Sequence, residues 1–111
     1  MKKVIAGRVY NTETAIEICE IPCNSSGVTD FRWHETSLYR TKNGNYFLAG
    51  EGNAMSMWSE PCGDMTGSGS GIRPITKSEA RDYAEVGEIG LYRRSLTPEE
   101  MLEAGFELTE A

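Results

Sequence analysis

The pair Asn43-Gly44 constrains the fold more than any other feature of this sequence, because it separates two segments with the composition of β-strands. Asn-Gly is favoured in a two-residue type I′ turn, in which both central residues need a positive φ. Residues 31–42 and 45–50 are therefore predicted to form an antiparallel hairpin. The register set by such a turn pairs Lys42 with Asn45, Thr41 with Tyr46, Arg40 with Phe47 and Tyr39 with Leu48.

Cross-strand partners share a face of a sheet, so this register gives the hairpin an apolar face and a mixed face. The expected core face contains Phe31, Trp33, Tyr39, Tyr46 and Leu48. The expected mixed face contains Arg32, His34, Leu38, Arg40, Lys42 and Phe47. A mixed face of this kind is either half covered by the rest of the chain or available to a partner.

The N-terminal part of the chain predicts a strand followed by a short helix. Residues 3–10 are rich in strand-forming side chains and form the first expected strand. Asn11 or Thr12 offers an N-cap for a helix that would extend to Glu20, and Pro22 would end it.

The segment after the hairpin is less regular. Residues 51–71 contain several glycines, and the apolar side chains around Trp58 suggest that the segment lies across the sheet. The run Gly67-Ser68-Gly69-Ser70-Gly71 favours a mobile loop over a phosphate cradle, because a P-loop needs a lysine after its glycines. Ile72–Ile75 is expected to form a short edge strand, since Pro74 cannot donate to a sheet ladder.

Two capping boxes mark helices in the C-terminal third. Thr76 and Glu79 form the first, and Thr97 and Glu100 form the second, which has a proline in its first turn and Gly105 as its stop. The 111 residues thus predict one α+β domain over 1–111, with an antiparallel sheet of three or four strands and two or three helices packed on one side. Residues 97–111 would form a C-terminal acidic helix and tail.

The charge of the chain is acidic and unevenly distributed. The net charge is −6, and residues 51–111 carry five Lys and Arg against twelve Asp and Glu. A field of this sign repels nucleic-acid phosphates and attracts basic surfaces, although solubility alone would also account for it. No basic-then-apolar leader and no apolar run of bilayer length is present, so we expect a cytoplasmic protein.

Catalytic and metal-binding signatures are weak. The only histidine, His34, falls in a strand pattern, and no nucleophile elbow or pinned carboxylate pair accompanies it. Cys19, Cys23 and Cys62 could join His34 in a Cys₃His zinc site, but a zinc site usually shows two close pairs of ligands and this chain has one. We therefore expect free structural thiols, no cofactor and no enzymatic turnover.

Two surfaces are candidates for binding a partner. On the last helix Glu99, Glu103 and Glu107 recur every four residues with Glu100 beside them, a row that could dock on an arginine-rich channel or could be a solvated face. The alternative is a basic hairpin face with Arg32, His34, Arg40 and Lys42, which could bind RNA or DNA. The total charge and the single aromatic on that face, Phe47, oppose the alternative.

Three blocks of the sequence carry a family resemblance. They are Tyr10-Asn11-Thr12-Glu13-Thr14-Ala15, then Leu38-Tyr39-Arg40-Thr41 with Gly44 and Tyr46-Phe47-Leu48-Ala49-Gly50-Glu51-Gly52, then Ile72-Arg73-Pro74-Ile75-Thr76 with Glu79-Ala80. The chain resembles a family of short proteins of phages and mobile elements of Gram-positive bacteria, with the pattern YxTETA…LYRxxxGxYFLxGEG…IxPLxxxEA. The match covers roughly residues 4–84, and the chain departs from the family pattern after Ala84.

Small acidic proteins of this origin include anti-CRISPR and other anti-defence inhibitors. The resemblance therefore implies a protein that binds a host protein or nucleoprotein complex and occludes it sterically or by charge mimicry. The residues expected to contact that partner are Glu99, Glu100, Glu103, Glu107, Arg32 and Arg40.

Overall fold

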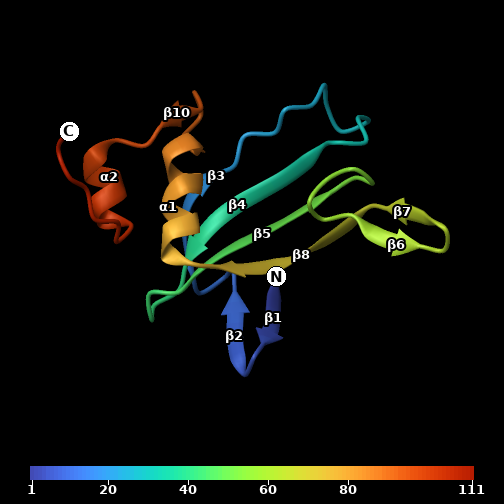
Figure 1. Ribbon diagram of the computed structural model, residues 1–111, viewed down its shortest axis with the longest axis horizontal. Coiled ribbons are helices and arrows are strands. Elements are labelled where there is room, and N and C mark those ends of the chain that lie inside the picture. The colour runs from blue at the N-terminus through green and yellow to red at the C-terminus, as the bar shows by residue number, and fades with distance from the viewer.

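The two strands predicted around Asn43-Gly44 are adjacent inner strands of a six-stranded antiparallel sheet in the computed structural model, which describes residues 1–111 (Figure 1). The strands are β1 (Lys2–Ile5), β2 (Arg8–Asn11), β3 (Ile16–Glu20), β4 (His34–Arg40), β5 (Tyr46–Gly52), β6 (Glu60–Cys62), β7 (Met65–Gly67), β8 (Gly69–Ile75), β9 (Glu88–Ile89) and β10 (Arg94–Ser95). The helices are α1 (Lys77–Val86) and α2 (Pro98–Glu103). The large sheet has the order β10-β9-β3-β4-β5-β8, and β1–β2 and β6–β7 are separate ribbons.

The predicted fold class was wrong, because the chain is mostly sheet and has only two short helices. The segment 12–20 is not a helix. Its second half is strand β3, where isoleucine and glutamate alternate and pair with β4. The glycine-serine run is likewise not a loop, because Gly69 begins the seven-residue strand β8.

The N-terminal segment also differs from the single strand expected. Ala6 and Gly7 have φ values of 53° and 76°, which are typical of a two-residue type I′ turn, and they join β1 to β2 in a tight hairpin. The turn type predicted for Asn43-Gly44 is therefore used at a different pair.

The hairpin of β4 and β5 closes with a three-residue loop, 42–44. The Thr41 N–H donates to the Asn45 carbonyl at 2.8 Å, the Gly44 N–H donates to the Thr41 carbonyl at 2.9 Å, and Gly44 has a φ of 83°. This loop still uses Gly44 in the left-handed region, but it shifts the register by one residue from the predicted one. The observed pairs include Arg40 with Tyr46, Tyr39 with Phe47 and Leu38 with Leu48.

The shift exchanges the faces of β4, so the predicted core face was wrong. Leu38 is fully buried, together with its partner Leu48, in the cluster beneath the helices. Tyr39 stacks on Phe47 on the opposite face, with ring centroids 5.1 Å apart. Phe31 and Trp33 precede β4, and Phe31 is exposed.

One face of the sheet is covered by both helices and by residues 53–59. Its core cluster contains Cys19, Leu38, Tyr46, Leu48, Trp58, Ala80, Ala84, Met101, Ala104 and Phe106. Tyr46 ties the C-terminal segment to the sheet, because its hydroxyl donates to the Ala104 carbonyl at 2.6 Å and its ring stacks on Phe106. Both predicted capping boxes are present, with Thr76 and Thr97 as N-caps.

Four glycines lie side by side on this covered face, where β5 pairs with β8. Gly50 is opposite Gly71 and Gly52 is opposite Gly69. A Cβ atom at Gly52 would be 2.2 Å from the Ser56 Oγ atom, and one at Gly69 would be 2.2 Å from the Trp58 carbonyl oxygen. The absence of side chains lets residues 53–59 lie directly on the sheet.

The opposite face is only half covered. A smaller cluster of Tyr10, Phe47, Ala49 and Ile72 forms where the β1–β2 ribbon packs on the sheet. The ribbon lies below the sheet in Figure 1, at the end where β4 finishes and β5 begins. The other half of this face carries the side chains described next. No helix in the structure is long and apolar enough to cross a membrane.

Candidate protein-binding surface

The uncovered half of the sheet is rich in glutamate. Strand pairing places Glu17 opposite Tyr39, Glu20 opposite both Ser37 and Glu88, and Glu35 opposite Glu51. Partners share a face, and Tyr39 and its neighbour Phe47 belong to the cluster beneath the β1–β2 ribbon. The acidic side chains that therefore share the ribbon's side of the sheet are Glu17, Glu20, Glu35, Glu51 and Glu88.

Glu35 and Glu51 are direct cross-strand neighbours with the same charge. Such a pair destabilises a sheet, and neither residue takes part in any of the four ion pairs of the structure. Both residues are exposed. Their repulsion is therefore relieved by solvent and salt alone, and a cation brought by a partner would relieve it further.

A groove continues this acidic surface around the edge of the sheet. It lies between β3, β9 and α2, and we call it the acidic groove. Its carboxylates are Glu17, Glu20, Glu88, Glu100 and Glu103, and the apolar side chains that line it include Ile16, Ile18, Leu96 and Ala104. Ile16 is 67% exposed although it is large and apolar. An apolar floor between carboxylates suits a segment that presents both aliphatic and basic side chains.

The electrostatic effect of the glutamates reaches neighbouring groups. Burial, with the charges of Glu17 and Glu20 as smaller causes, raises the pKa of the Cys19 thiol to about 12. Burial also raises the pKa of Tyr39, with Glu17 as the second cause. Both groups stay neutral at physiological pH, so the field of this surface comes from the carboxylates.

A protruding turn stands beside the groove, between β9 and β10. Leu91 and Tyr92 at its tip are 90% and 91% exposed. Arg93, the next residue, bonds to Glu20 through its guanidinium at 3.3 Å and so ties the turn to the sheet. Tyrosine and arginine are enriched among the residues that dominate protein interfaces, so this turn has the composition of a binding surface.

The predicted row of carboxylates on the last helix was wrong. Helix α2 ends at Glu103, so Glu107 lies beyond it in an exposed, non-helical segment. Glu100 is bound by Arg94 at 2.7 Å and also accepts the Thr97 N–H. These bonds lower the pKa of Glu100 to about 2, and the hydrogen bond from Arg94 is the largest cause. Of the predicted acidic residues, the groove brings together Glu100 and Glu103 but neither Glu99 nor Glu107.

The predicted basic face was also wrong, because its two arginines lie in different surroundings. Arg32 is not on a strand: it lies in the loop before β4, where its guanidinium pairs with Asp30 at 3.3 Å. Arg40 lies on the helix-covered face, 5.9 Å from the centre of the Tyr46 ring. Its Nε atom is buried without a hydrogen-bond partner. The two residues therefore do not form a shared surface for a nucleic acid.

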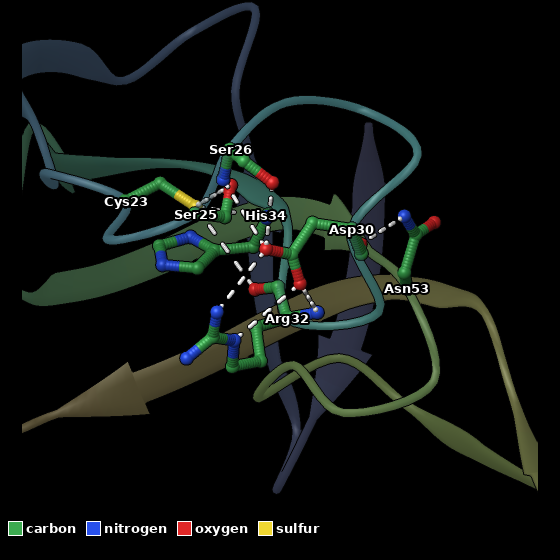
Figure 2. A network of polar contacts seen from close by, with 7 residues as sticks. All are labelled: Cys23, Ser25, Ser26, Asp30, Arg32, His34 and Asn53. Atoms are coloured by element: carbon green, nitrogen blue, oxygen red, sulfur yellow. Dashed lines mark hydrogen bonds and ion pairs between the residues drawn. The ribbon is translucent and has the colours of Figure 1, made fainter.

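The loop that holds Arg32 is organised by Asp30, whose carboxylate lies between Ser26 and Arg32 in Figure 2. It accepts bonds from the backbone N–H and the hydroxyl of Ser26 and from the backbone and side chain of Arg32. These bonds, led by that of the Arg32 backbone N–H, hold the pKa of Asp30 well below its usual range. The network explains why Arg32 is engaged within its own loop.

The four residues considered as zinc ligands are not gathered. Cys19 is buried beneath α1, Cys62 is exposed on the β6–β7 ribbon, and Cys23 accepts the His34 backbone N–H at 3.3 Å. The His34 ring turns its Nδ1 atom to the Thr36 hydroxyl at 2.9 Å, and burial lowers its pKa. No group of three His, Cys, Asp or Glu side chains has a metal-binding arrangement.

The glutamates of the sheet were missed because their position depends on strand pairing. The sequence predicts a helix at Glu17 and does not place Glu35 and Glu51 on a common face, whereas the structure has Glu17 in β3 and pairs Glu35 with Glu51. One local signal was available: Ile16-Glu17-Ile18 alternates with the period of a strand. That alternation predicts a strand with an acidic face.

Known proteins provide no further guide to this surface. No protein-family model, no curated protein and no solved structure matches the chain. The resemblance to short proteins of phages and mobile elements thus stays a prediction from its three sequence blocks.

Proposed function

We propose that this protein functions by binding, without turnover, to a host protein or nucleoprotein complex that presents a basic surface. The acidic groove is the observation that carries the proposal. It combines carboxylates from two strands and a helix with exposed aliphatic side chains, among them Ile16. A partner that normally holds nucleic-acid phosphates offers the matching lysines and arginines.

The proposed mechanism is occlusion in the cytoplasm of the host cell. Occupation of a basic channel by this acidic surface would exclude the nucleic acid both sterically and by competition for the same cations. A net charge of −6 would speed encounter with such a channel and would disfavour direct contact with nucleic acid. Together with the sequence resemblance, this favours a nucleic-acid-handling defence complex, such as a CRISPR effector, as the target.

The test begins with affinity capture from a bacterial host lysate and continues with dissociation constants for the captured component. The groove variant carries Glu17→Gln, Glu88→Gln and Glu103→Gln. The matched control carries Glu99→Gln, Glu107→Gln and Glu110→Gln, which changes the charge equally outside the groove. At low salt we expect the groove variant to bind at least about tenfold more weakly, a loss of ~1.4 kcal/mol, and the control to bind almost normally.

Two results would count against this function. An equal loss in both variants would show that only total charge matters. Tight binding of the wild-type protein to RNA or DNA in a salt titration would instead favour the nucleic-acid-binding alternative. Thermal unfolding of each variant provides the control for folding.

A further inference from the structure

Strand β8 forms an open edge of the large sheet, and its unpaired backbone groups can be identified. In β5, Asn53 donates to the Trp33 carbonyl at 2.9 Å, and the Asn45 carbonyl accepts from Thr41. The backbone N–H and C=O groups of the odd-numbered residues of β5 therefore point toward β4, and those of the even-numbered residues point toward β8. Through the observed register, Ser70, Ile72 and Pro74 direct their backbone groups away from the sheet.

This edge lacks most of the features that prevent strands from pairing with other chains. It is seven residues long, and it contains neither a lysine nor a bulge in its pairing with β5. Only Pro74, near the C-terminal end of β8, lacks a backbone N–H that could donate to another strand. The opposite edge of the sheet, by contrast, finishes in the two-residue strand β10. In Figure 1 β8 lies at the margin of the sheet with the β1–β2 ribbon below it, and β5 is the only strand that pairs with β8.

We propose that β8 pairs with β8 of a second copy of this chain, antiparallel about a two-fold axis at Gly71. In this register Ser70 of each protomer is opposite Ile72 of its partner, and each such pair exchanges both of its N–H···O bonds. A register centred on Ile72 would instead place Ser70 opposite Pro74, which has no N–H to donate. The proline therefore favours the register centred on Gly71.

Charge complementarity supports the same register. It places Arg73 of one protomer opposite Gly69 of the other, on the helix-covered face. Gly69 has no side chain of its own, and the Glu60 side chain lies over it: a Cβ atom at Gly69 would be 2.9 Å from the Glu60 carboxyl carbon. Two-fold symmetry then produces two contacts between Arg73 and Glu60 of opposite protomers. Glu60 has no ion pair within its own chain.

The mass of the purified protein in solution, measured by sedimentation equilibrium, tests this proposal. We expect a reversible dimer of twice the 12.3 kDa chain mass. Ser70→Pro removes an outward N–H without removing a bond to β5, and should raise the dimer dissociation constant at least ~tenfold. Ser70→Ala keeps that N–H and should leave the constant unchanged.

A charge exchange tests the register. Arg73→Glu and Glu60→Arg should each weaken the dimer ~tenfold, and the double exchange should restore it. Arg73 also donates to the Met57 carbonyl, so the unfolding temperature of each variant is measured in parallel. A wild-type protein that stays monomeric at all concentrations would overturn the proposal and leave the edge to a strand of another protein. An unchanged dimer dissociation constant in Ser70→Pro would also overturn the proposal. If the double exchange did not restore the dimer, the register centred on Gly71 would be wrong.

Discussion

The two faces of the central sheet differ in what their side chains do. On the helix-covered face, Leu38 and Leu48 are fully buried, and the Trp58 indole N–H donates to the Thr36 hydroxyl at 2.7 Å. On the other face, half of the surface is covered by a two-stranded ribbon and half carries glutamates, of which Glu35 and Glu51 have no ion pair. Stability therefore resides mainly on one face, which leaves the other free to retain charges that weaken the sheet.

The largest test of this difference is a matched pair of truncations in β5. Leu48→Ala removes a fully buried side chain from the covered face and should lower the free energy of unfolding by about 3 kcal/mol. Glu51→Ala changes an exposed residue three positions away and should alter it by less than about 0.5 kcal/mol. Urea denaturation of both variants measures the contrast. Equal losses would mean that both faces are structural.

A smaller effect on stability is expected when Glu100 is replaced, because the low pKa of its carboxyl group makes the free energy of unfolding depend on pH. Its folded-state pKa of about 2 lies below the ordinary value of 4.5, so its stabilising contribution is present above pH 4.5 and is lost as pH falls toward 2. Glu100→Gln should therefore lower the unfolding temperature at pH 7 and flatten its decline on acidification. Glu99→Gln, on the same helix, is the control for the loss of one negative charge.

The smallest expected effect is a gain in stability. Glu35→Gln removes the cross-strand repulsion from Glu51 and should raise the free energy of unfolding by about 0.3 kcal/mol at low salt. Glu51→Gln should add nothing further in that background, because the repulsion is already absent. The gain should shrink as salt rises. A loss of stability in the single variant would show that the carboxylate makes a structural contact.

Features decided by neighbouring residues could be predicted from the sequence. Thr76 and Thr97 cap their helices as expected, since a capping box is complete within four residues. The hairpin around Gly44 was also expected. Its register was not, because Asn-Gly fits a two-residue turn as well as a three-residue loop, and only packing against the helices selects between them.

Features decided by distant partners could not be predicted. The alternation of Ile16, Glu17 and Ile18 favours a strand only over three residues, and the position of β3 in the sheet depends on β4, which pairs with it across 13 intervening residues, 21–33. The acidic groove depends on that same pairing, because it brings Glu17 and Glu20 near Glu88 and α2, which are far apart in sequence. Glu100 and Glu103 were identified from the sequence, but their neighbours across the groove were not.

The four glycines between β5 and β8 have a consequence for how this protein can vary. Because the Ser56 side chain occupies the space of a Cβ atom at Gly52, and the Trp58 carbonyl oxygen occupies that space at Gly69, even alanine would clash there. In a survey of tolerated substitutions these positions would form an invariant patch with no ligand behind it. Substitution would thus be poorly tolerated at backbone positions that residues 53–59 cover, and better tolerated among the exposed glutamates that we expect to meet a partner.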